Sequence, residues 1–225
     1  MTQGYFITGT DTGVGKTLIA CALLHAYSAR GLRVIGMKPV AAGAMRIAGR
    51  LINDDVTALQ AASTIVAPGR LVNPYCFEAP IAPHIAASLE GLSIEIELLH
   101  AAYAELSALA DRVIVEGAGG FRVPLSANHD TADLARRLQL PVVLVVGMRL
   151  GCINHALLTA SAIAAAGLKL AGWIANHVDP SMLRMDENID ALQSRLHAPL
   201  LARIPYVRSP HAREFASLLD IKSLF

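Results

Sequence analysis

The chain has 225 residues, of which 54% are hydrophobic and only 16% are charged, a composition that fits one globular domain with a large core. Its 19 basic and 18 acidic residues nearly cancel, and no basic stripe is present. Nucleic acid is therefore not expected as a main partner, because phosphate neutralisation needs clustered lysines and arginines. The three cysteines have no metal-ligand spacing, and the chain starts without a charged-then-apolar leader; both features predict a reduced, cytoplasmic protein.

The predicted secondary structure alternates between short apolar runs rich in β-forming residues and longer helical runs. Several apolar runs, such as "VVLVV", lack polar alternation, which is typical of strands covered on both faces. The predicted strands span residues 5–9, 33–38, 113–116, 142–147, 170–176 and 200–204. The predicted helices lie near residues 15–29, 54–63, 94–110, 130–138, 153–166, 185–196 and 211–219. This alternation implies right-handed βαβ connections, so we predict one α/β domain over residues 1–225, with a mainly parallel sheet of about seven strands and helices on both faces.

Residues 150–168, "LGCINHALLTASAIAAAGL", form a long stretch without charge. The stretch contains Asn154, His155 and Thr159 and lies between two predicted strands, which argues against a membrane span. We predict a helix that is either buried all round or shared with a partner subunit.

A phosphate-binding loop is predicted at "GTDTGVGKT", between the first strand and the first helix. In this setting the loop amides and the helix N-terminus point at phosphate groups. Lys16 would reach the β- and γ-phosphates, and the Thr17 hydroxyl would bind Mg²⁺. The common motif G-x-x-x-x-G-K-[ST] has four residues between its glycines, whereas five separate Gly9 from Gly15 here. The loop predicts nucleotide binding but leaves the chemistry open.

Charged residues end two further predicted strands. Glu116 closes "RVIVE" and precedes "GAGG", which is the place for a carboxylate that holds Mg²⁺ or water in a phosphate-loop protein, although it also suits a cap for the next segment. Lys38 in "GMKPV" would share one anionic site with Lys16, unless it is a solvated strand-end lysine. Asp54 and Asp55 either start a helix or supply one magnesium ligand, and the sequence does not separate these alternatives.

Two other features follow the predicted strands or connect them. The segment 71–87, "LVNPYCFEAPIAPHIAA", is a proline-rich loop too long for a plain connection, so we expect it to shape a site. His84 within it is a candidate base, although a lone histidine is more often structural. Asn176 ends "LAGWIAN", and its amide suits either the edge of adenine or a turn.

Taken together, these motifs resemble the dethiobiotin synthetase family of the biotin pathway. The matching blocks run in order through most of the chain: "YFITGTDTGVGKT", "GMKPVAAG", "VNPYCFEAPIAPH", "VEGAGG", "PVVLVVGMRLGCINHALLT", "LAGWIAN" and "IPY". The lengthened loop with Thr10 is itself typical of that family. The final residues, 208–225, match nothing that assigns them a role.

The resemblance implies a single-domain phosphate-loop fold and an ATP- and Mg²⁺-dependent ring closure in biotin biosynthesis. The family converts 7,8-diaminononanoate, CO₂ and ATP to dethiobiotin, ADP and phosphate. One amine is carboxylated to a carbamate, whose oxygen attacks the γ-phosphorus of ATP. The second amine then attacks the resulting carbamic–phosphoric anhydride and closes the ring.

The same resemblance implies roles for individual residues. The catalytic group comprises Lys38, Lys16 and Thr12. Mg²⁺ would be held by Thr17, Asp55 and Glu116. The residues implied in ATP binding are Gly13, Val14, Gly15, Lys16, Thr17, Asp55, Glu116, Gly117, Ala118, Gly119, Asn176, His177, Pro205, Tyr206 and Val207. The residues implied in substrate binding are Thr12, Lys38, Ala42, Cys152, Ile153 and Asn154.

The family is a homodimer in which the "GCINHA" helix start of one subunit closes the substrate site of the other, so a homodimer without membrane or nucleic-acid partners is expected. Three positions depart from the family pattern: Gly13 stands where family members often have Glu, Ala42 where they commonly have Ser, and His177 where an acidic residue is frequent. Two rival classes of P-loop protein fit the sequence less well. A partition-type switch ATPase would carry a lysine at position 11, which is Asp here, and a larger amidoligase relative would need a further domain.

Overall fold

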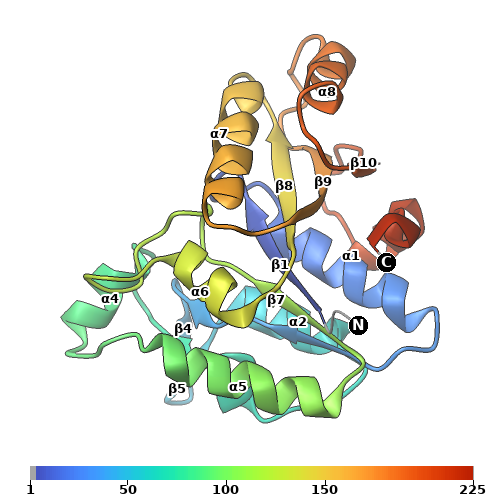
Figure 1. The fold of residues 1–225 in the computed structure, drawn as a ribbon. Coiled ribbons are helices and arrows are strands. Elements are labelled where there is room, and N and C mark those ends of the chain that lie inside the picture. The colour runs from blue at the N-terminus through green and yellow to red at the C-terminus, as the bar shows by residue number, and fades with distance from the viewer. Residues whose placement is uncertain (1–3, 225) are drawn as a thin grey trace.

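Six parallel strands form the central sheet in the computed structural model, which describes residues 4–224 (Figure 1). Their order across the sheet is β10-β9-β8-β1-β7-β2, so the strand that carries the phosphate loop lies in the middle. The strands are β1 (Gly4–Gly9), β2 (Val34–Met37), β7 (Arg112–Glu116), β8 (Val142–Met148), β9 (Leu170–His177) and β10 (Leu200–Ile204). The prediction of a mainly parallel α/β sheet is confirmed, and each of the six predicted strands lies in it.

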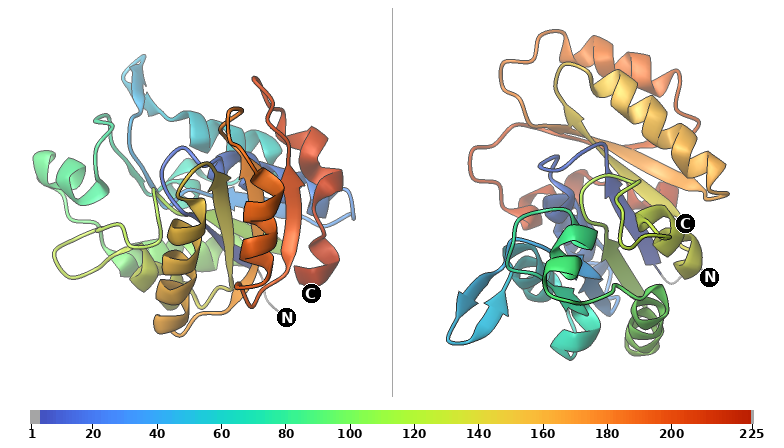
Figure 2. Two further views of the ribbon diagram at one scale, coloured as in Figure 1. Left: turned by 90° about the horizontal axis from the view of Figure 1, so that it is seen from above. Right: turned by 90° about the vertical axis from the view of Figure 1, so that its left-hand side faces the viewer.

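The sheet has six strands rather than about seven, because the remaining short strands pair outside it. β3 (Val40–Ala41) and β6 (Tyr75–Cys76) form a parallel pair, and β4 (Met45–Ile47) and β5 (Arg50–Ile52) form an antiparallel hairpin. The hairpin projects from the body of the molecule in the right-hand view of Figure 2. These pieces belong to the connections beyond the sheet edge, where they surround the site described below.

Helices cover both faces of the sheet, and the side chains of each strand point alternately to the two layers. Tyr5 and Ile7 of β1 are buried on one side, and Phe6 between them is buried on the other. The first layer contains α1 (Lys16–Ser28), α2 (Asp54–Ala62), α9 (Ala212–Phe215) and the 3₁₀ turns η1 (Ala216–Leu218) and η2 (Ile221–Leu224). The second contains α5 (Ile96–Leu109), α6 (Thr131–Leu138), α7 (Cys152–Ala165) and α8 (Met185–Gln193).

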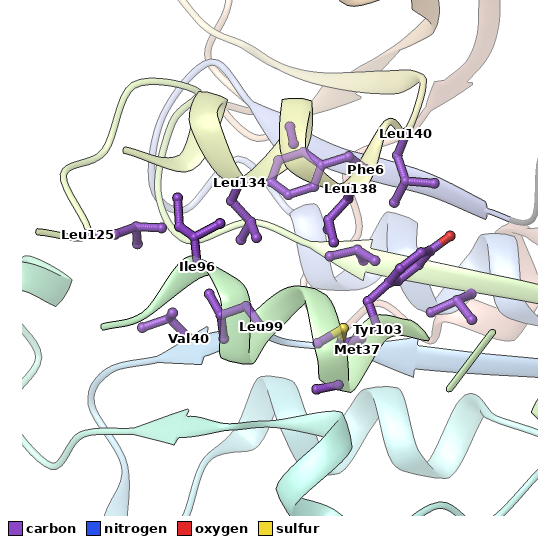
Figure 3. Packing of buried hydrophobic residues seen from close by; sticks show 14 of the residues in the cluster. Phe6, Met37, Val40, Ile96, Leu99, Tyr103, Leu125, Leu134, Leu138 and Leu140 are labelled. Carbon is purple, nitrogen blue, oxygen red and sulfur yellow. The ribbon is translucent and has the colours of Figure 1, made fainter. Parts of the chain in front are cut away.

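The second layer includes the large apolar cluster of Figure 3. Phe6 from the sheet packs in it with Leu99 and Tyr103 of α5 and with Leu134 and Leu138 of α6. Burying a large apolar side chain stabilises a fold by about 1.5–3 kcal/mol, so this cluster holds α5 and α6 firmly against the strands. The strands that α5 and α6 cover are therefore a rigid base for the residues that follow the strand ends.

The proline-rich segment 71–87 is more ordered than a loop, which corrects the prediction. It contains the end of α3 (Gly69–Val72), then β6, and then α4 (Pro83–Leu89). Pro83 occupies the start of α4, where its missing N–H removes no helical hydrogen bond. The segment is thus a series of short helices and a strand separated by prolines, rather than an unstructured loop.

The charge-free segment 150–168 contains α7, which is not buried all round in the single chain. Cys152, Ala156 and Ile163 are buried, whereas Asn154 and Leu158 are exposed. That alternative of the prediction is therefore wrong, and sharing of the exposed face with a partner stays a prediction. Between residues 4 and 224, no helix combines the length and apolar character needed to cross a bilayer.

The C-terminal residues 208–224 complete the first layer. Phe215, Leu219 and Ile221 are buried in the same cluster as α1. The Asp220 N–H donates to the carbonyl oxygen of Leu201 at 2.8 Å, and the Tyr5 hydroxyl donates to the carbonyl of Leu224. The segment to which the sequence assigned no role therefore closes the core over α1.

Candidate active site

A cavity of about 800 Å³ opens at the carboxyl ends of β1, β2 and β7. This is the edge at which open α/β sheets bind their ligands. Four connections meet there: the phosphate loop, the segment after β2, the proline-rich segment and the glycine-rich segment after β7. The lining residues are Asp11, Thr12, Gly13, Gly15, Lys16, Thr17, Lys38, Val40, Ala42, Asp55, Pro80, Ile81, Ala82, Pro83, Glu116, Ala118, Gly119, Gly120 and Val123.

The phosphate loop has a backbone that requires its glycines. Gly13 and Gly15 have φ values of 74° and 89°, in the left-handed region that favours glycine. A Cβ at Gly9 would lie 2.5 Å from Cγ2 of Val14, whose side chain is fully buried. The loop therefore folds tightly back over β1, and α1 starts at Lys16 beside the cavity, where the free N–H groups of a helix start can bind anions.

The extra residue of the loop is tied to β8. The Thr10 N–H donates to the carbonyl oxygen of Val145 at 3.0 Å, and the Gly147 N–H donates to Thr10 Oγ1 at 3.3 Å. On the other side, a Cβ at Gly119 would lie 3.5 Å from Thr12 Oγ1, so the glycine-rich segment after β7 runs close beside the loop. The stretch 10–12 is thus held between the ends of β8 and β7, the two strands that flank β1.

Lys38 pairs with two carboxylates inside the cavity, and the Thr17 hydroxyl contacts the same two groups. Its Nζ lies 2.6 Å from Oε1 of Glu116 and 2.8 Å from Oδ2 of Asp55. Thr17 Oγ1 lies within hydrogen-bond distance of the same acids, at 2.7 Å from Asp55 Oδ1 and 2.9 Å from Glu116 Oε1. The side chains of Lys38 and Glu116 are 6% and 1% exposed, so water screens this pair little. The burial of Lys38 excludes the solvated alternative for this lysine. Asp54 and Asp55 both lie in the first turn of α2, and the magnesium roles of Asp55 and Glu116 stay predictions.

The protonation of this cluster follows from burial and neighbouring charge. Burial lowers the pKa of Lys16 to about 8, and the nearby Lys38 ammonium adds to this effect. Burial also opposes the charge of Lys38, but Glu116 and Asp55 reverse that effect and raise its pKa. Burial likewise opposes the Asp55 charge, yet Lys38 brings the Asp55 pKa below its usual value. For Glu116, burial dominates over Lys38 and raises the pKa.

The oxygen atoms of Thr17, Asp55 and Glu116 suit a hard divalent cation. Oε2 of Glu116 is buried and makes no hydrogen bond within residues 4–224, so it retains its capacity to bind. No group of three or more His, Cys, Asp or Glu side chains placed to hold a metal ion occurs in that range, so a metal site formed by these side chains would include the Thr17 hydroxyl. Mg²⁺ takes few protein oxygens and keeps waters or phosphates as its other ligands, which fits this set.

Two asparagines that the sequence reasoning missed position the site. Asn73 Nδ2 donates to the Lys38 carbonyl at 2.6 Å and so fixes the chain that carries the lysine. Asn53 caps α2 by accepting from the Val56 N–H at 3.3 Å, and its Nδ2 donates to the carbonyl of Ala42 at 3.2 Å. An asparagine before "DDVTALQAA" is a recognisable cap signal, whereas no local signal exists for Asn73.

The residues predicted to bind adenine lie outside the cavity lining, and Asn176 among them contacts the phosphate loop. Asn176 is buried, and its Nδ2 donates to the Val14 carbonyl at 2.8 Å. The rings of His177 and Tyr206 meet edge to face, with centroids 6.0 Å apart, because β9 and β10 are neighbours. Pro205, Tyr206 and Val207 are exposed after β10. Asn176 thus connects this exposed surface to the loop.

The residues at the start of α7 also lie outside the described cavity lining. Cys152 is buried against α8, Ile153 is half-buried, and Asn154 is exposed. Burial raises the pKa of the Cys152 thiol, which supports a packing role over a nucleophilic one. His84 is half-buried in α4, and it too is outside the lining.

The fold and the phosphate loop define a P-loop nucleotide-binding protein. The AAA domain family profile matches residues 3–212. A ParA family ATPase from Chlorobium tepidum superposes with a TM-score of 0.56 at 17% identity, covering 92% of this chain and 84% of the other. MinD in the MinC:MinD complex of Aquifex aeolicus gives 0.55 at 19% identity, covering 92% and 82%. At these identities the likeness concerns the fold alone.

Sequence similarity is much higher to another group within this class. The ATP-dependent dethiobiotin synthetase BioD of Aromatoleum aromaticum is 57% identical over 97% of both chains. That of Nitrosospira multiformis is 55% identical over 98% of this chain and 96% of the other. The chain belongs to the ATP-dependent dethiobiotin synthetase family, as its motifs indicated.

Proposed function

We propose that the protein catalyses the ATP-dependent formation of dethiobiotin from 7,8-diaminononanoate and CO₂ in the cytoplasm. The observation that carries the proposal is the meeting of Lys16, Lys38 and two carboxylates beside the phosphate loop, in a chain similar over its whole length to dethiobiotin synthetases. A simple nucleotide switch does not need the second buried lysine, whereas the reaction of a second anion with ATP does.

The proposed reaction has three steps. An amine of the substrate adds to CO₂ and loses a proton, which gives a carbamate. A carbamate oxygen attacks the γ-phosphorus of ATP, and ADP leaves with the electron pair of the broken P–O bond. The second amine then attacks the carbonyl carbon of the carbamic–phosphoric anhydride, phosphate leaves, and loss of the amine proton completes the cyclic urea.

The lysines would lower the electrostatic barrier between the two anions. Lys16 would contact the β- and γ-phosphates from the helix start, and Lys38 would face the transferred phosphoryl group and the carbamate. Both ammonium groups are held before ATP arrives: Lys16 Nζ donates to the Asp11 carbonyl at 2.9 Å, and Lys38 is held by its two acids. Preorganised charge of this kind stabilises a transition state without further reorganisation. Thr12 and the loop amides would bind phosphate and carbamate oxygens.

Mg²⁺ is the proposed cofactor, with Thr17, Asp55 and Glu116 as its protein ligands. When bound there, the ion would neutralise phosphate charge. The three side chains would orient the phosphates relative to Lys38, because the two acids also hold the Lys38 ammonium. The glycine-rich residues Gly117, Ala118 and Gly119 would let the backbone approach the nucleotide closely.

Adenine is proposed to bind at the ends of β9 and β10. Asn176, whose Nδ2 is engaged by the Val14 carbonyl, would present its oxygen to the base edge. His177 would border the same region, and Pro205, Tyr206 and Val207 would line its other side. In this arrangement the amide of Asn176 connects base recognition with the phosphate loop.

The protein is proposed to act as a homodimer in which Cys152, Ile153 and Asn154 of one subunit complete the substrate site of the other. The exposed Asn154 and Leu158 on α7 agree with a covered interface. Mixing an inactive Lys38→Met variant with an Asn154→Ala variant should restore activity in mixed dimers, because one of the two shared sites is then intact. Absence of restoration in verified mixed dimers would contradict the shared site.

The central test is product formation by the purified protein. With 7,8-diaminononanoate, bicarbonate, Mg²⁺ and ATP, dethiobiotin and phosphate should appear in a 1:1 ratio, and phosphate release should stop without the diamine. Lys38→Met should abolish turnover while ATP binding, measured by calorimetry, changes little. If no dethiobiotin forms, or if phosphate is released equally without the diamine, the proposed function is wrong.

A further inference from the structure

Asp11, in the lengthened part of the phosphate loop, forms an ion pair with Arg149 that neither the phosphate chemistry nor the metal site uses. An Arg149 Nη2 hydrogen bond goes to Oδ2 of Asp11, and the other carboxylate oxygen, Oδ1, accepts from the Thr12 N–H at 2.7 Å. The Asp11 carbonyl accepts from Lys16 Nζ at 2.9 Å. Asp11 is therefore in contact with three groups at once: Arg149, the Thr12 amide and the Lys16 ammonium.

Arg149 itself lies between β8 and α7. Its carbonyl oxygen accepts from the Cys152 N–H at 3.0 Å, in the turn that starts α7. Thr10 makes two hydrogen bonds to β8, and the Asp11–Arg149 pair adds a third attachment of the lengthened loop on the same side. The loop and the α7 start are thereby held as one unit.

The pair is poorly suited to stabilise the fold. The side chains of Arg149 and Asp11 are 39% and 50% exposed, and ion pairs at that exposure contribute little to folding stability. The pair instead fixes the direction of the Asp11 side chain, which accepts from the Thr12 amide and, through Arg149, is tied to the turn that precedes α7. We therefore expect the Asp11–Arg149 pair to affect the geometry of the active site more than the stability of the fold.

We propose that Arg149 is a positioning residue for the synthetase reaction, acting through Asp11 to hold residues 10–12 beside the transferred phosphoryl group. The inference rests on the proposed function and adds to it a residue outside the cavity lining. The loop residues proposed to bind ATP begin at Gly13 and run directly into α1, whereas residues 10–12 are proposed to lie beside the transferred group. Loss of the pair should therefore lower kcat far more than it weakens ATP binding.

The experiment compares Arg149→Gln, Asp11→Asn, the double variant and Arg149→Lys, with Arg137→Gln as matched control. Arg137 has a similar side-chain exposure of 42% and pairs with Glu97, between α6 and α5. Each single variant at the pair should lower kcat at least tenfold with the ATP dissociation constant within threefold. The double variant should be no slower than the slower single one, Arg149→Lys should recover most of kcat, and the control should match the unaltered protein.

Hydrogen exchange gives a readout that does not depend on turnover. The amides of residues 10–12 should exchange faster in Arg149→Gln and Asp11→Asn than in the control, with α1 unchanged. Unaltered exchange there overturns the inference, even if the protein makes no dethiobiotin and the proposed function fails separately. Three kinetic results would also overturn the inference. They are a normal kcat in Arg149→Gln, single-variant effects that multiply in the double variant, and ATP binding that weakens as much as kcat falls.

Discussion

Removal of the Lys38 ammonium tests the electrostatics of the site without any substrate. In Lys38→Met, Glu116 loses the partner that lies 2.6 Å away while its own side chain stays 1% exposed. Breaking a buried ion pair on one side costs about 3–5 kcal/mol, because a charge is left buried without compensation. Asp55 is 41% exposed and can be solvated, so we expect a loss near the lower limit, about 3 kcal/mol at pH 8.

The loss should depend on pH with a definite sign. Burial already raises the pKa of Glu116, and without Lys38 the main group that opposes that rise is gone, while the Thr17 hydrogen bond remains. A carboxyl whose pKa is raised in the folded state favours folding below its unfolded pKa, and this advantage disappears as the pH rises through the folded value. At about pH 5 the raised pKa favours the neutral form of Glu116, so the variant should be only about 1–2 kcal/mol less stable than the unaltered protein, through the lost hydrogen bond.

Urea unfolding measures both values, followed through the fluorescence of the single, fully buried Trp173. Lys38→Met/Glu116→Gln is the control, because it removes both charges; it should regain stability at pH 8 and lose the pH dependence. An equal loss for Lys38→Met at pH 5 and pH 8, or a double variant no more stable than the single one, would refute the assignment of a charged buried pair.

Three further outcomes are expected. Because Lys16 has a pKa of about 8 and gains anionic neighbours with ATP, binding near pH 8.5 should take up protons, seen as buffer-dependent heats in calorimetry; no uptake would contradict this. Gly15 has a φ of 89°, and a Cβ added there would lie 2.3 Å from Asn176 Nδ2, so Gly15→Ala should weaken ATP binding at least tenfold. Gly31 has a φ of 78° but open space around it, so the control Gly31→Ala should lose only about 1–2 kcal/mol of stability. Cys21 should resist thiol reagents at pH 8 until the protein unfolds, because burial raises its pKa to about 12; reaction in the folded state would disprove its burial.

Much of the fold was readable from local pattern. Strands such as "VVLVV" are apolar because both of their faces are covered, and that requirement is visible in the order of residues. The small elements were not: β4 and β5 are only three residues long, shorter than the run over which alternation indicates a strand, and Met45 and Ile47 are more than half exposed. The main sheet has six strands rather than about seven, since the short strands pair outside it.

The sequence by itself determined the phosphate loop, with Lys16 and Thr17 at fixed spacing, and the strand ends at which Lys38 and Glu116 stand. Such signals are local, because a few consecutive residues dictate the turn and the helix start. Only the tertiary structure decided that Asp55 joins Lys38, although 17 positions separate them, and that Glu116 keeps one oxygen without a partner among the described residues. Parallel strands bring their carboxyl ends to one edge, but which side chains touch there depends on the strand order and on the packing of the connections, which no short stretch of sequence contains.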